Sequence, residues 1–363
     1  MSVKMVDSKD FAIGGGKARQ SNIEALRLLS MLMVLNLHSF WGYDHGNGFI
    51  QALDFFREST SICAVNVFLL ISGYFGIKWR WKSFYNLVFQ IFFYGFGVYV
   101  VACSIGIIDF SIKRLLANVT CTYSHWSFIK HYILLYFFSP LLNAFVEKVS
   151  NKQLLLFIVV LMICENFISR DNRFTNYCLM YLVGRWLYKT DYVTKMSINP
   201  AKFYWIITFA ITFFVYFFYT YTPINTAERM CNFVLGYDYA APLVIIQAIC
   251  IFILFARLQF RSKIINWCAS SSLAIFLIHM HPSISGIGYY AITESFYNMP
   301  VWQHCIYLIL LITGVLFGSI LIDKIRIVIS DFVYLIIEKF VSLLPTKILS
   351  VDTYIPQTLK RIL

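Results

Sequence analysis

The chain alternates long apolar stretches with short polar ones. Stretches long enough to cross the ~30 Å hydrocarbon core of a bilayer occur about ten times. They lie at residues 23–43, 60–77, 84–106, 127–146, 153–169, 175–189, 203–221, 239–257, 270–291 and 303–323. Because backbone polar groups inside a bilayer must be bonded within the protein, the pattern predicts an all-α, polytopic membrane helical bundle of about ten transmembrane helices.

The composition supports a membrane protein. Of the 363 residues, 59% are hydrophobic and 18% aromatic, which is more apolar surface than a soluble domain carries. The net charge of +12 is typical of cytoplasmic loops that meet anionic lipid, so membrane lipids are predicted partners and nucleic acid is not. Nine scattered cysteines without a CxxC pair argue against a disulfide framework or a zinc site, and we predict no metal.

The distribution of basic residues predicts the orientation. With the N-terminus inside, 21 of the 30 lysines and arginines fall in cytoplasmic segments and 6 on the opposite side. This bias predicts that both termini are cytoplasmic and that the protein lies in the cell's inner (cytoplasmic) membrane. Residues 1–20 and 326–363 are then cytoplasmic tails. Within the second tail, 326–345 reads as an interfacial helix; the alternative is an eleventh span, which the charges near its middle disfavour.

The first apolar stretch carries three polar residues that helical membrane segments seldom contain. Arg27 and His38 are eleven residues apart, so on a helix they lie on nearly one face, about 16 Å apart. Glu24, one turn before Arg27, can pair with it. An intramembrane Arg and His indicate a functional site. The alternative is a structural Glu–Arg pair with His38 as a hydrogen-bonded core residue.

A basic cluster follows the second apolar stretch. Lys78, Arg80 and Lys82 alternate with Trp79 and Trp81 on the predicted cytoplasmic side. Cations in this pattern can bind a phosphate-rich ligand. They can equally be an interfacial anchor, since basic residues and tryptophans are common there.

Other polar residues mark the ends of later stretches. His125, Trp126 and Tyr136 lie at or near the predicted outer edge, either at the mouth of an acceptor site or as interfacial anchors. His279 and His281 point about 200° apart on a helix and therefore do not chelate one metal ion. Pro282 predicts a kink or break just after them, and Gly73, earlier in the chain, permits a close turn or backbone approach.

Five motifs, in this order, resemble the acyltransferase-3 family of integral membrane acyltransferases. Arg27 and His38 match the family's first-helix pattern of Arg, ten residues and His, within SNIEALRLLSMLMVLNLH. The other motifs are VFLLISGYF, SHWSFIKHYILLYFFSPLL, MYLVGRWL and SSLAIFLIH. The resemblance covers about residues 20–323, so 21–325 is the expected transmembrane acyltransferase domain. One departure is that the family often has Arg-x-x-Arg where this chain has Lys78, Arg80 and Lys82.

The resemblance implies a membrane O-acyltransferase. Such an enzyme moves an acyl group, usually acetyl, from cytoplasmic acyl-CoA to a hydroxyl of a cell-surface polysaccharide or a lipid-linked glycan precursor. Acyl-CoA is a donor substrate here, so no permanently bound cofactor is expected. Other polysaccharide-assembly proteins are possible partners.

The same resemblance suggests roles for the polar residues. His38 takes the proton of the acceptor hydroxyl or forms an acyl-histidine, and both roles remain open. Arg27, paired with Glu24, guides the donor inward. The resemblance also suggests that the donor phosphates bind to Lys78, Arg80 and Lys82, and that Ser72 or His279 positions or polarises the thioester carbonyl. On the acceptor side it suggests His125, Trp126 and Tyr136.

A transporter or flippase of lipid-linked glycan is the alternative, since it would use the same polar cavity without acyl chemistry. Transporters often contain inverted repeats, and no such repeat is visible in the chain. Transfer of labelled acetyl groups distinguishes the two.

Overall fold

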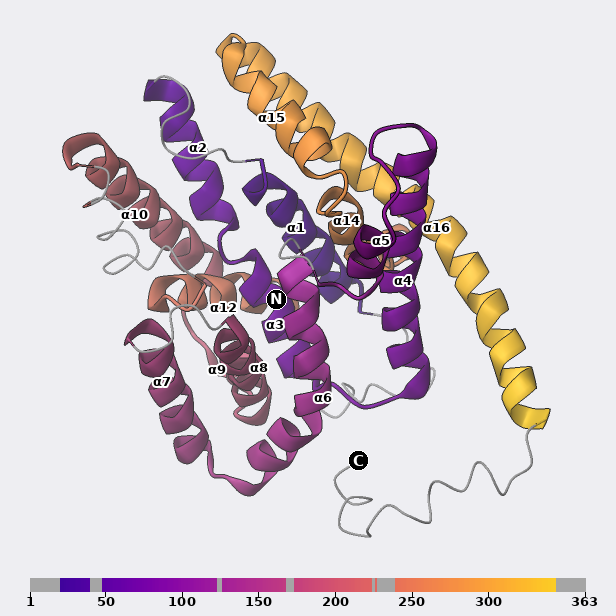
Figure 1. Ribbon diagram of the computed structural model, residues 1–363. Helices are drawn as coiled ribbons and strands as arrows, with labels where there is room; N and C mark the ends of the chain where they lie inside the picture. The colour runs from indigo at the N-terminus through magenta and orange to yellow at the C-terminus, as the bar shows by residue number, and fades with distance from the viewer. Residues whose placement is uncertain are drawn as a thin grey trace. The chain divides into compact units, whose positions relative to one another are not determined.

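The computed structural model describes residues 20–39, 48–122, 126–167, 173–223, 226 and 239–343. Every regular element in these ranges is a helix (Figure 1). The chain divides into two compact units, one of Met1–Ile77 and Val146–Ser270 (unit 1) and one of Lys78–Phe145 and Ser271–Leu363 (unit 2). The prediction of an all-α fold is confirmed for the described residues.

Unit 1 is built on two helices that pack closely along their length. Its elements are α1 (Ser21–Leu37), α2 (Gly48–Ser61), α3 (Ala64–Phe75), α7 (Asn151–Phe167), α8 (Arg173–Lys189), α9 (Tyr192–Lys195), α10 (Pro200–Tyr221), α12 (Pro242–Arg257) and α13 (Lys263–Ala269). The most extensive contact is between α3 and α8, and α1 packs on α2, α3, α12 and α13.

Unit 2 surrounds a short buried helix. Its elements are α4 (Trp81–Ser104), α5 (Ile112–Val119), most of α6 (Ser127–Lys148), α14 (Ser272–His279), the π-turn η3 (Gly286–Tyr290), α15 (Ala291–Ser295), the 3₁₀ turn η4 (Phe296–Asn298) and α16 (Val301–Leu343). The short helix α14 contacts both α4 and α16. A buried ion pair in α16, Asp323–Arg326, receives a hydrogen bond from the Tyr94 hydroxyl of α4 (Oη to Asp323 Oδ1, 2.8 Å).

Local sequence signals account for several helix ends. Pro200 and Pro242 each begin a helix, where the missing N–H costs nothing. The Asn199 side chain accepts hydrogen bonds from the first backbone N–H groups of α10. Gly76 follows α3 with a φ of 72°, a conformation that favours glycine and ends the helix.

Several helices are suited to a bilayer. In the described part of the chain, five helical segments are long and apolar enough to cross a membrane by length and composition: Gly48–Phe75, Trp81–Ser104, Ser127–Lys148, Pro200–Tyr221 and Val301–Phe340. Two shorter apolar segments are Pro242–Arg257 and Lys263–His279. The chain is a multi-pass membrane protein. Each of the apolar stretches predicted from the sequence overlaps a helix.

The helix ends can be compared with the span and domain boundaries that the sequence predicts. The predicted second span, 60–77, is preceded by the helix α2, so that residues 48–61 are not a loop. The helix that contains the predicted last span, 303–323, does not end with it, because α16 continues without a break through Asp323 and Arg326 to Leu343. The predicted boundary between a membrane domain and a tail at 325/326 therefore falls inside one helix. The break expected at Pro282 is confirmed, since α14 ends at His279.

Candidate functional site

The polar residues of the first helix lie at its two ends. Near the N-terminus of α1, Arg27 Nη1 donates to Glu24 Oε1 at 2.8 Å, so the predicted pair is present. Glu24 is buried, whereas the Arg27 side chain keeps 38% of its surface exposed. An ion pair this open contributes little to stability. Arg27 is therefore accessible to a ligand while the pair with Glu24 orients it.

His38 is the capping residue at the C-terminus of α1. The helix ends at Leu37, and the His38 N–H donates to the Val34 carbonyl (3.1 Å). The side chain is half-buried. His38 therefore lies where the helix stops, next to backbone carbonyls that have no partner within the helix. The position of His38 therefore depends on the contacts that fix the C-terminal end of α1.

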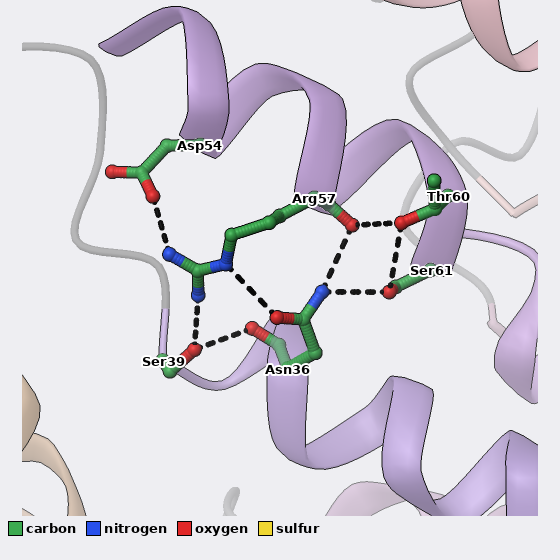
Figure 2. Close-up of polar contacts among 6 residues, drawn as sticks. All are labelled: Asn36, Ser39, Asp54, Arg57, Thr60 and Ser61. Carbon is green, nitrogen blue, oxygen red and sulfur yellow. Dashed lines mark hydrogen bonds and ion pairs between the residues drawn. The ribbon is translucent and has the colours of Figure 1, made fainter. Parts of the chain in front are cut away.

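Arg57 of α2, whose side chain is 13% exposed, holds this helix end, as Figure 2 shows. The Arg57 guanidinium contacts three acceptors at once. Its Nε donates to Asn36 Oδ1 (3.0 Å), Nη2 donates to Ser39 Oγ and Nη1 is paired with Asp54. Two of these acceptors flank His38 in the chain.

Return contacts tie the two helices together in the opposite direction (Figure 2). Asn36 Nδ2 donates to the Arg57 carbonyl (2.9 Å) and to Ser61 Oγ (2.8 Å). The Thr60 hydroxyl donates to the same Arg57 carbonyl (2.7 Å). The end of α1 and the end of α2 are thus joined by side-chain and backbone bonds on both sides.

Sequence reasoning missed this network. The apolar pattern predicts spans at 23–43 and 60–77 and no helix between them, where Arg57 lies. The available signal was the i, i+3 spacing of Asp54 and Arg57, which pairs the two on one helical face. Nothing local indicated that Asn36 and Ser39 would meet Arg57.

Ser72 and His279, suggested as supporting residues, are engaged with their own helices. Ser72 Oγ donates to the Phe68 carbonyl of α3 (3.0 Å). In α14, His279 is buried and its Nδ1 contacts the Ile275 carbonyl, which requires Nδ1 to carry the hydrogen. In the neutral ring, Nε2 is then the acceptor nitrogen.

The predicted donor cluster lies at the start of α4 in unit 2. Arg80 is the residue before the helix, and Lys78 and Lys82 lie on either side of it in the chain. The Tyr136 hydroxyl of α6 is within hydrogen-bonding distance of both the N–H (3.2 Å) and the carbonyl (3.3 Å) of Arg80. Lys82 Nζ lies 5.0 Å from the ring centroid of Tyr334 in α16. The helix N-terminus and the three cations all favour an anion.

The predicted acceptor residues are not gathered at one place. Tyr136, predicted on the acceptor side, contacts the backbone of Arg80. Trp126 is fully buried and packs edge-to-face on His281 (ring centroids 5.3 Å apart). His125 lies outside the described residues. Within the described part of unit 2, Tyr136 therefore lies beside the basic cluster of Lys78, Arg80 and Lys82.

Comparison with known proteins gives the class of protein and then its family. The long apolar helices define a multi-pass membrane protein. The model of the acyltransferase-3 family, described as an acyltransferase domain, matches residues 20–323, so the chain belongs to this family. It is an acyl-transfer enzyme of a membrane. No curated protein and no solved structure matches the chain.

Proposed function

We propose that the protein is an O-acetyltransferase of a cell-surface polysaccharide or of its lipid-linked precursor, with cytoplasmic acetyl-CoA as donor. The observation that carries the proposal is the family match over residues 20–323, which includes the Arg27 and His38 motif. For acyl transfer, the chain offers His38 as a base, the cations Lys78, Arg80 and Lys82 for the donor, and a multi-pass helical fold.

The proposed reaction uses His38 as a general base. Its imidazole takes the proton of the acceptor hydroxyl while the hydroxyl oxygen attacks the thioester carbonyl. The bond from the acyl carbon to sulfur breaks, an ester forms, and the thiolate of CoA leaves and receives the proton. An acyl-histidine intermediate is the alternative course, in which the acyl group is first bonded to the ring nitrogen.

The remaining residues are assigned to binding. Lys78, Arg80 and Lys82 bind the donor phosphates, and Arg27 guides the donor towards His38. We propose that His125 and Trp126 lie towards the acceptor.

For the whole chain, we propose ten membrane spans with both termini in the cytoplasm. We propose that the protein lies in the inner (cytoplasmic) membrane of the cell. The excess of lysine and arginine in alternate connecting segments supports this orientation. The donor cluster then faces the compartment that contains acyl-CoA.

The test is transfer of label from [¹⁴C]acetyl-CoA to surface glycan or lipid-linked precursor, with purified protein in proteoliposomes. We expect His38→Ala to lower transfer by at least about 100-fold, since a general base contributes that much, with unchanged yield and thermal unfolding. His131→Gln is the matched control, because His131 is a histidine of the candidate span Ser127–Lys148 that has no proposed role. Its activity should stay within about twofold of the wild type.

Two results would count against the proposal. If the glycan crosses the liposome membrane but receives no label, the protein is a flippase. If folded His38→Ala protein retains transfer, His38 has neither of the proposed roles.

A further inference from the structure

The C-terminal end of α1 has few ways to satisfy its backbone. The last carbonyls of a helix have no partner within it, and in a buried position water does not replace that partner. Ser39 Oγ donates to the Asn36 carbonyl (2.7 Å), which caps the end locally. Ser39 is almost fully buried, so the cap lies in the protein interior. The cap therefore holds the backbone on both sides of His38, which lies between these two residues.

Arg57 is the group that connects this cap to the rest of unit 1. The guanidinium donates to the Asn36 side chain and to the same Ser39 hydroxyl that caps the helix. Its charge is balanced by Asp54, whose side chain is only 2% exposed. A planar guanidinium directs its N–H groups towards several acceptors in fixed directions, whereas a lysine ammonium is a single point of charge. The contact therefore requires arginine geometry as well as a positive charge.

Arg57 is itself held by a rigid part of the fold. The helix α2 ends at Ser61 and α3 begins at Ala64, so the helical structure is interrupted one turn after Arg57. The Ser59 carbonyl accepts from Gln247 Nε2 of α12 (2.9 Å), and the Thr60 carbonyl accepts from the Tyr204 hydroxyl of α10 (2.6 Å). The end of α2 is thus fastened by α10 and α12, and Arg57 transmits that position to α1.

We propose that Arg57 is a positioning residue for His38, acting through Asn36 and Ser39. The inference rests on the proposed function of His38 as the reacting imidazole. A displacement of about 1 Å at a reacting group can cost about 100-fold in rate. Loss of the Arg57 contacts should therefore slow the chemical step. It should leave donor affinity unchanged, because the residues proposed to bind the donor phosphates lie in a different unit.

The experiment measures kcat and KM for acetyl-CoA of Arg57→Lys and Arg57→Gln in proteoliposomes. We expect kcat to fall by about 10- to 100-fold in both variants and KM to change by less than about twofold. Arg57→Lys should not rescue activity, because lysine keeps the charge but not the three directed contacts. Full activity of Arg57→Lys would overturn the inference.

Ser39→Ala is a milder variant in case the arginine substitutions prevent folding. It removes one contact of the guanidinium and one cap bond with little change in volume, and we expect kcat to fall by about 3- to 10-fold. In a double-mutant cycle, Ser39→Ala should have a smaller effect in the Arg57→Gln background than in the wild type, because the two residues share one contact. Fully additive effects would overturn the proposed route.

Tyr204→Phe is the matched control for a general loss of bonding at the end of α2. It removes the hydrogen bond to the Thr60 carbonyl but no contact with α1. If Tyr204→Phe lowers kcat as much as Arg57→Gln, Arg57 has only a structural role and the inference fails. Failure of the proposed function has a different outcome, because the wild type and His38→Ala would then show equal transfer.

Discussion

The three cations at the start of α4 illustrate how single residues can be tested. Lys78, Arg80 and Lys82 are next to a helix N-terminus, and the Arg80 backbone is held by Tyr136. Both features favour bound phosphate. The chain thus has cations where the family often has Arg-x-x-Arg, and their contribution to donor binding can be measured by charge removal.

We expect Lys78→Ala/Lys82→Ala to raise KM for acetyl-CoA by about 10-fold and to leave kcat nearly unchanged, because phosphate binding is made equally in the ground and transition states. Initial rates over a range of donor concentrations measure this. Lys202→Ala, which removes an exposed cation of α10, is the control and should keep the wild-type KM.

A donor without its 3′-phosphate gives an independent measurement. The wild type should show a raised KM for 3′-dephospho-acetyl-CoA, and the double variant should lose little more. If the double variant binds both donors as well as the wild type, the cations are only an interfacial anchor.

At the scale of elements, two glycines explain how α3 and α8 come so close. A Cβ on Gly73 would lie 2.1 Å from the Tyr181 carbonyl oxygen, and one on Gly184 would lie 2.5 Å from the Leu70 carbonyl oxygen. Small residues allow membrane helices to approach at backbone distance. The expected backbone approach at Gly73 is confirmed. Because the obstructing atoms belong to the backbone, a side chain at either position forces the helices apart.

We expect Gly73→Ala and Gly184→Ala to destabilise the protein by about 1–3 kcal/mol or more, as overpacking does. Thermal unfolding in detergent, followed by tryptophan fluorescence, measures the effect. Gly97→Ala is the matched control, since no atom lies within 4 Å of a Cβ at this position of α4. It should be neutral or slightly stabilising, because alanine favours a helix. Equal loss in all three variants would contradict the close-contact explanation.

At the scale of the whole molecule, the longest helix exceeds the thickness of a bilayer. The 43 residues of α16 are about 64 Å long, roughly twice the hydrocarbon core. The helix therefore tilts strongly or continues outside the bilayer. The buried Asp323–Arg326 pair lies where the apolar span was expected to end. Because Tyr94 of α4 bonds to Asp323, contact with α4 helps to stabilise α16 beyond that point.

The proposed topology predicts which segments face outwards. Asp109, before α5, should be external, and Lys152, at the start of α7, should be cytoplasmic. In intact cells, a membrane-impermeant maleimide should label Asp109→Cys above the background of the native cysteines. Lys152→Cys should react only after permeabilisation. The reverse pattern would overturn the proposed orientation.

The sequence predicted the helices well where apolar length alone decides, as in α4, α6 and α10. It failed at α2, since residues 48–61 mix apolar residues with Asp54, Arg57 and Glu58 and so resemble a polar connection. In the fold, the pairing of Asp54 with Arg57 and contacts from α1 satisfy these polar groups. Tertiary contacts of this kind do not appear in local hydrophobicity.

By itself, the sequence determined the all-helical membrane class, the acyltransferase-3 family and the presence of Arg27 and His38 on the first helix. These follow from local composition and from ordered motifs along the chain. Only the tertiary structure decided that Arg57 meets Asn36 and Ser39 beside His38, and that Tyr136 meets Arg80. The physical reason is that hydrogen bonds between distant segments depend on how helices end, break and pack, and these positions are set by the whole fold.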